Sequence, residues 1–149
     1  MRYQDVWEDG ECREAGERDC DGRYRLIAET LPTGHFTALD IGAHTGYFAR
    51  RIAESFPARV TAVDNYPGLV ACHGVEVISE RLGAARLAQL PRHDVVLALS
   101  VLHHMADWRE ALPLMAACRS HLIIEVCHPS ERWMRRAAAR GGWLLSTTR

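Results

Sequence analysis

The residues best placed for chemistry form one short run, Asp40-Ile-Gly42-Ala-His44-Thr-Gly46, with the spacing D-x-G-x-x-x-G. Gly42 permits a tight turn with backbone close to a ligand, and Gly46 lets a following helix pack closely. An acid at the end of a strand suits a cationic group. A dinucleotide site would need G-x-G-x-x-G, because an adjacent carboxylate would repel a pyrophosphate bound at the helix amides. The run predicts a cofactor site that includes Asp40, Gly42, Ala43, His44 and Gly46.

Two further elements support an adenosine-containing ligand. Asp64 ends the next apolar run, about 20 residues on, where a carboxylate can accept hydrogen bonds from both ribose hydroxyls. Asn65 follows it directly. The third element is the apolar run that begins at Asp94 and continues through Leu99-Ser100 to His103-His104-Met105. Asp40 and Asp64 complement each other as acids at the ends of neighbouring strands.

Taken together, these three elements resemble class I methyltransferases that use S-adenosylmethionine (SAM), in the branch that acts mainly on small molecules. The resemblance runs from about Tyr24 to Cys127. It implies SAM as the cofactor, with Asp40 near its methionine portion, Asp64 at the ribose, and Leu99 and Ser100 lining the methionine end. The implied reaction is in-line displacement of the methyl group by an oxygen, nitrogen or carbon atom of a small-molecule acceptor, and no metal is required.

Within that resemblance, His103 and His104 could supply a general base, because imidazole titrates near neutral pH. The alternative is that they only shape the loop. His44 is interpreted as a turn residue whose backbone belongs to the site. The adenine contact is left between Glu80-Arg81-Leu82 and Arg86-Leu87.

The elements that must position these residues alternate between apolar runs and amphipathic segments, as in α/β folds with a parallel sheet. A crossover helix is expected over 46–56, and another after Asp107, whose side chain could cap it. Pro113 is expected to kink this helix or delay its start. A Rossmann-like sheet of about five strands, in the order 3-2-1-4-5, is implied, with at most one extra strand. The strands are expected at Phe36 to Ile41, Arg59 to Asp64, Val75 to Ser79, Asp94 to Ser100 and His121 to Cys127.

The two ends of the chain are harder to interpret. Residues 1–20 are expected to be a flexible arm, in which Tyr3 and Trp7 either close over the ligand as a lid or anchor to the core. A lead-in helix follows from Asp21 to Thr30. Near the other end we expect a helix from Ser130 to Arg140 and one short strand after it, so a homodimer that shares a sheet edge is an open alternative.

Composition limits the class of protein. A chain of 149 residues that is 48% hydrophobic fits one domain, 1–149. A net charge of −1 argues against a general nucleic-acid surface, although Arg and Trp residues over 132–143 keep RNA open as a partner. No apolar run suggests a signal peptide or a membrane span, so a cytoplasmic location is expected. Five scattered cysteines predict reduced thiols.

Two rival functions stay open at this point. A non-catalytic module with the same fold would bind SAM without turnover, which the short C-terminal end and the lack of an unambiguous catalytic residue would suit. An enzyme for another adenosine ligand, such as decarboxylated SAM or a nicotinamide cofactor, is the second rival. The missing G-x-G-x-x-G weighs against the nicotinamide version.

Overall fold

The computed structural model describes residues 3–126 and the backbone of residues 145–146. Its centre is a parallel sheet with the strand order β5-β4-β3-β6-β7-β8. The first five of these match the expected order 3-2-1-4-5, so the predicted Rossmann-like fold is confirmed. They are β3 (Phe36–Ile41), β4 (Ala58–Val63), β5 (Val75–Ile78), β6 (Val95–Leu99) and β7 (His121–Glu125), and the sixth strand is β8 (Leu145–Ser146).

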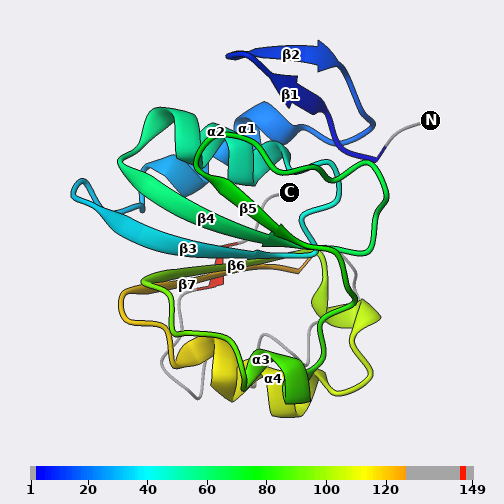
Figure 1. The fold of residues 1–149 in the computed structure, drawn as a ribbon, viewed down its shortest axis with the longest axis vertical. Helices are drawn as coiled ribbons and strands as arrows, with labels where there is room; N and C mark the ends of the chain where they lie inside the picture. Colours follow the sequence, from blue (N-terminus) through cyan, green and yellow to red (C-terminus); the bar gives the residue numbers. More distant parts are fainter. Residues whose placement is uncertain (1–2, 127–144, 147–149) are drawn as a thin grey trace.

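Helices cover both faces of this sheet, which explains why its central strands are apolar on both sides. Helices α1 (Cys20–Ala28) and α2 (Tyr47–Ser55) lie on one face, and α3 (Ala84–Leu87) and α4 (Trp108–Ala116) lie on the other (Figure 1). Alternate residues of β3 therefore enter different cores: Ala38 packs with α1 and α2, whereas Leu39 packs with α3 and α4. The same alternation decides where the side chain of Asp40 points.

Helix α4 begins after Asp107, as the sequence predicted, but it is not capped in the predicted way. The Asp107 side chain makes no bond to its own helix. Instead, its Oδ2 accepts a hydrogen bond of 2.6 Å from the backbone N–H of Ala84, at the start of α3. Helix α4 runs through Pro113 and begins at Trp108, so the proline does not delay its start.

The N-terminal segment contains a β-hairpin, where the sequence analysis expected only a flexible arm. Strand β1 (Val6–Glu8) pairs antiparallel with β2 (Glu11–Glu14). Asp9 and Gly10 join them, with φ values of 50° and 78°. Two consecutive residues with positive φ form the turn that suits the twist of a hairpin, and Asp-Gly is a favoured pair there.

The hairpin is attached to α2 by aromatic and charged contacts. The Trp7 ring lies 5.7 Å from the Tyr47 ring, centroid to centroid. The guanidinium of Arg51 lies 4.3 Å from the Trp7 ring and 3.8 Å from the Tyr24 ring. Trp7 thus anchors to the core, one of the two roles considered for it. The role of the segment as a lid stays a prediction.

At the other end of the chain, β8 (Leu145–Ser146) pairs parallel with β7, with Leu145 opposite Ile124. This agrees with the single extra strand expected there. The helix predicted from Ser130 to Arg140 lies outside the described residues. No disulfide joins the four cysteines within residues 3–126. Among the described residues, no helix has the length and apolar character needed to cross a membrane.

Candidate functional site

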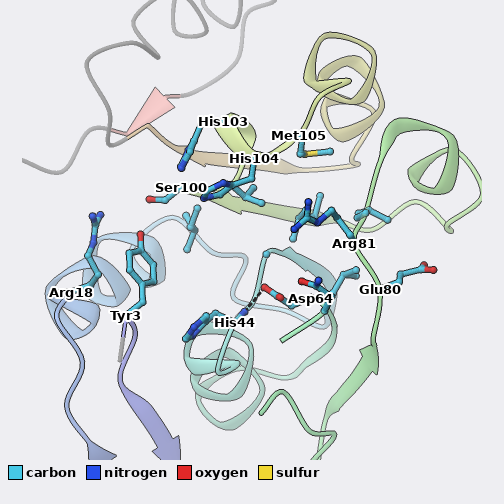
Figure 2. A pocket seen from close by; sticks show the side chains of 17 residues that line it. Tyr3, Arg18, His44, Asp64, Glu80, Arg81, Ser100, His103, His104 and Met105 are labelled. Atoms are coloured by element: carbon cyan, nitrogen blue, oxygen red, sulfur yellow. Dashed lines mark hydrogen bonds between the residues drawn. The ribbon is translucent and has the colours of Figure 1, made fainter. Parts of the chain in front are cut away.

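A cavity of about 480 Å³ opens at the carboxyl ends of the central strands (Figure 2). In open α/β sheets, ligands bind at this edge, at the point where the strand order reverses. Here that point is at β3, because β4 lies on one side of it and β6 on the other. Seventeen residues line the cavity: Tyr3, Arg18, Ile41, Gly42, His44, Val63, Asp64, Asn65, Glu80, Arg81, Leu82, Leu99, Ser100, Val101, His103, His104 and Met105.

The loop after β3 is pinned to the end of β4. The backbone N–H of Gly42 donates to the Val63 carbonyl at 2.9 Å. Gly42 has a φ of 75°, and a Cβ there would lie 2.6 Å from the Cγ2 atom of Val101. Both facts require glycine, because a side chain would be strained and would fill the space against the neighbouring loop.

Asp64 is oriented by two backbone donors. Its Oδ2 accepts from the N–H of His44, and its Oδ1 accepts from the N–H of Tyr66, each at 2.8 Å. His44 has a φ of 53°, which agrees with its interpretation as a turn residue. Its ring stacks on Tyr66 with centroids 4.1 Å apart. The carboxylate of Asp64 is therefore fixed at the wall of the cavity.

Asp40 differs from Asp64 because it lies beneath α2 and does not line the cavity. Its side chain is on the face of β3 that carries Ala38, and it is 1% exposed. Burial and the nearby Asp64 raise the pKa of Asp40 to about 7, although a hydrogen bond from the Ala49 backbone and the charge of Arg23 lower it. Its Oδ2 is buried without a hydrogen-bond partner. The carboxyl group of Asp40 is therefore in position to influence the site by its charge, and not by lining the cavity.

A buried ionic cluster holds the loop after β6. Ser100, with a φ of 55°, donates from its hydroxyl to Glu125 Oε2 at 2.5 Å. Arg23 donates to the same oxygen, and the Arg18 guanidinium lies 3.5 Å from Glu125 Oε1. We call Arg18, Arg23, Ser100 and Glu125 the glutamate cluster. It joins α1 and Arg18, which lies two residues before that helix, to the ends of β6 and β7.

His103 and His104 follow this loop on a short 3₁₀ helix, η1 (Leu102–His104). Their rings are 3.8 Å apart, centroid to centroid, and inclined at 45°. Both line the cavity.

The far end of the cavity is lined by one of the two segments that the sequence left open for the adenine contact. Glu80, Arg81 and Leu82 line it, whereas Arg86 and Leu87 do not. Arg86 instead donates from Nε to Glu80 Oε1 at 2.6 Å. The contact between residues 80–82 and a base stays a prediction.

Eight of the eleven residues predicted for the site line the cavity, and they come from the ends of β3, β4 and β6. Ala43 and Gly46 lie outside it, with Asp40: Ala43 is buried, and Gly46 precedes α2 with a φ of 79°. The eight are Gly42, His44, Asp64, Asn65, Leu99, Ser100, His103 and His104.

The predicted site did not include Arg18 or Met105, and the sequence analysis considered Tyr3 only as part of a lid or as a core anchor. Met105 directly follows the histidine pair, so its position was available from the sequence. Arg18 carries no local signal, because it reaches the site through a contact with Glu125, 107 residues away. Within the described ranges, no group of three or more metal-ligating side chains is present.

Comparisons with known proteins identify a family for this chain. The family model for the methyltransferase domain matches residues 39–118, more than half of the chain. That range includes the loop after β3, Asp64, the segment after β5 and the histidine pair. A comparison with curated protein sequences found no match.

Several solved structures share the fold. Precorrin 8w decarboxylase from Methanobacterium thermoautotrophicum superposes with a TM-score of 0.67 at 16% identity, over 85% of this chain and 73% of that one. Magnesium protoporphyrin IX methyltransferase from Synechocystis, solved with bound SAM, gives 0.62 at 17%, over 82% and 66%. A putative methyltransferase of antibiotic biosynthesis from Anabaena variabilis gives 0.58 at 23%, over 70% and 44%. The chain thus spans less than two thirds of the last two proteins.

Proposed function

This chain belongs to the methyltransferase domain family, and from that premise we propose that it transfers a methyl group from SAM to a small-molecule acceptor. The accepting atom is an oxygen, nitrogen or carbon. The observation that supports this proposal is that eight predicted residues, from the ends of three strands, line one cavity. That cavity lies at the switch point of the sheet.

The residues present fit this cofactor. SAM carries positive charge on its sulfonium and amino groups, and the site offers the Asp64 carboxylate with the buried carboxyl of Asp40 behind it. The cradle at Gly42 lets backbone approach the ligand without a Cβ. Asp64, fixed by two backbone N–H donors, is in position to accept from ribose hydroxyls.

The chemistry divides between the cofactor and the chain. When bound, SAM supplies a methyl group on a good leaving group. The chain supplies orientation, which can be worth on the order of 7–11 kcal/mol. His103 or His104 would take a proton from an acceptor atom that must lose one, an effect of about two to four powers of ten in rate. The cavity volume of about 480 Å³ lies within the usual range of small-molecule sites, which supports a small acceptor.

Ligand binding tests the proposal directly. SAM and S-adenosylhomocysteine should raise the melting temperature, because a ligand that binds only the native state stabilises it. NAD should leave it unchanged. Calorimetry should give an affinity for SAM that falls by roughly 1.5–3 kcal/mol in Asp64→Ala, the scale of a hydrogen bond to a charged group.

The matched control for that variant is Glu76→Ala, which removes an exposed carboxylate from β5, outside the cavity lining. Its affinity for SAM should equal that of the wild type. A protein that binds NAD and ignores SAM would overturn the proposed cofactor. An unchanged affinity in Asp64→Ala would remove Asp64 from the site.

A further inference from the structure

Asp40 lies directly behind the lining of the cavity. Ile41 and Gly42, the two residues that follow it, both line the cavity, and so does Asp64 at the end of the neighbouring strand. The side chain of Asp40 is turned the other way, onto the face of β3 that α2 covers, where it is 1% exposed. The site therefore contains a second carboxyl group that is buried from solvent and close enough to interact with a charged ligand.

The surroundings of Asp40 give little support to a negative charge. Its Oδ2 atom is buried without a hydrogen-bond partner. The backbone N–H of Ala49, in the first turn of α2, donates to the carboxyl group. Burial without enough hydrogen bonds favours the neutral form of a carboxyl group, whereas each donor favours the ionised form. The geometry therefore leaves the two forms of Asp40 close in free energy.

Two charged groups face Asp40, and they come from different elements. Burial and the like charge of Asp64, at the end of β4, raise the pKa of Asp40 to about 7, while the charge of Arg23, on α1, lowers it. Arg23 is also bonded to Glu125, at the end of β7. A further charge in the cavity would therefore act on a carboxyl group that is already near its midpoint at neutral pH.

The other elements packed against Asp40 present apolar side chains or direct their charges elsewhere. In the sheet, Asp40 is flanked by Ala62 of β4 and Leu97 of β6. The charged side chains of α2 have partners of their own, since Arg50 donates to the Val70 carbonyl, Arg51 donates to Asp21, and Glu54 accepts from Trp7. Asp64 and Arg23 are thus the charges that a bound cation would join.

We propose that Asp40 distinguishes the sulfonium cofactor from its neutral product by losing a proton when the cation occupies the cavity. This role rests on the proposed function, which brings a sulfonium to the site and leaves a thioether there. The O–H bond of the Asp40 carboxyl group breaks, and its proton passes to solvent. A cation stabilises the ionised carboxyl group, whereas a neutral sulfur does not. When the methyl group leaves, the sulfur becomes neutral and Asp40 takes up a proton again.

The affinity for SAM should rise with pH. Below about pH 6 the free protein holds the proton on Asp40, and its release on binding costs affinity; above about pH 7 the carboxylate is already ionised, and that cost disappears. The affinity for S-adenosylhomocysteine should change less over the same range. Both compounds carry the same adenine, amino and carboxyl groups, so the ratio of their affinities isolates the effect of the sulfonium charge.

Calorimetric titrations with the two compounds test this role. In the wild type, the ratio of the SAM affinity to the S-adenosylhomocysteine affinity should rise about fivefold or more between about pH 5.5 and 7.5, the change produced when binding makes Asp40 about tenfold more acidic. In Asp40→Asn, which cannot ionise, the ratio should stay constant. Repeating the wild-type titrations in buffers with different enthalpies of ionisation should show more protons released with SAM than with S-adenosylhomocysteine.

The matched control is Glu76→Gln, which replaces an exposed carboxylate of β5, outside the cavity lining, by an amide of the same size. It should keep the wild-type dependence of the ratio on pH. Circular dichroism and a thermal melt establish that each variant is folded. A ratio that still rises with pH in folded Asp40→Asn assigns the proton to another group, such as a histidine of the cavity, and overturns the role of Asp40.

If Asp40→Asn is unfolded, Asp64→Asn carries the test. This variant removes the like charge that raises the pKa of Asp40, so the ratio should rise at a lower pH than in the wild type. A rise at the wild-type pH would overturn the role of Asp40. A wild type that binds both compounds with a constant ratio overturns this role alone, whereas a wild type that binds neither compound overturns the proposed function as well.

Discussion

The cavity has two walls that are held by different kinds of interaction: the loops after β3, β4, β5 and β6 form the sheet wall, and Tyr3 and Arg18 form the N-terminal wall. The sheet wall is held by the hydrogen-bonded parallel strands, and β3 and β4 alone form six residue pairs. The N-terminal wall stands on side-chain contacts with distant residues: Arg51 against Trp7 and Tyr24, and Arg18 against Glu125. Loss of one side chain should therefore disturb the N-terminal wall locally, while the sheet wall keeps its shape unless the fold itself is weakened.

The largest effect is expected at Glu125, where the two walls meet. Glu125→Gln removes the charge that holds Arg23 and Arg18 and leaves a buried guanidinium without its counter-ion. Breaking a buried ion pair in this way typically costs about 3–5 kcal/mol. Denaturant unfolding should give a loss of that order.

The control is Glu80→Gln, which removes the partner of Arg86 in a half-exposed pair. Exposed pairs contribute about 1 kcal/mol or less, so the two losses should differ clearly. Equal losses in both variants would mean that the glutamate cluster does not join the walls.

The next largest effect concerns the sheet wall and is read in turnover. If one histidine of the pair is the general base, His103→Ala or His104→Ala should bind SAM normally and lose about a hundredfold in single-turnover rate. His73→Ala, at the opposite end of the sheet, is the matched control. Single-turnover rates near the wild-type value in the double variant, measured between about pH 6 and 9, would rule out a general base at this pair. Orientation of the substrates would then be the mechanism.

A smaller effect is expected where the N-terminal wall is most tightly packed. A Cβ at Gly16 would lie 2.5 Å from the carbonyl carbon of Gln4, so Gly16→Ala must push this backbone apart. Overpacking of this kind costs about 1–3 kcal/mol. Gly34→Ala is the control, because nothing lies within 4 Å of a Cβ there. Unfolding curves that coincide for the two variants would show that the close approach is not required.

The last prediction is a dependence of stability on pH. The pKa of Asp40 is raised from 3.8 to about 7, so the folded state binds a proton that the unfolded state has released. The free energy of unfolding should therefore fall as pH rises from about 4 to 7, at most by about 1.4 kcal/mol per pH unit from this group. Asp40→Asn, which cannot ionise, should flatten that slope. An unchanged slope would mean that Asp40 is ionised throughout.

The sheet wall could be predicted because its signals are local. Apolar runs marked the strands to within about two residues, and the spacing of Asp40, Gly42 and Gly46 fixed a turn at the right strand end. The burial of Asp40 also has a local signal, since it shares the face of Ala38 in a strand that alternates between two cores. The hairpin had one as well, in the pair Asp9-Gly10.

The N-terminal wall could not be predicted because its contacts join residues far apart in the chain. Nothing near Arg18 in the sequence indicates that its guanidinium lies beside Glu125, or that Ser100 bonds the same carboxylate. The same holds for Asp107, whose side chain contacts the start of another helix and not its own. Such pairings depend on how elements pack, which spacing along one segment does not specify.

The left-handed backbone at His44 and Ser100 has a thermodynamic consequence for ligand entry. Non-glycine residues in this region of φ and ψ persist only when surrounding contacts hold them there. Here the Asp64 carboxylate holds one, and the Glu125 carboxylate and carbonyl hold the other. The ordering entropy of these two turns is thus lost during folding, before any ligand arrives. Ligand binding then requires little further ordering of these two loops, so this part of the cavity is preorganised for a ligand.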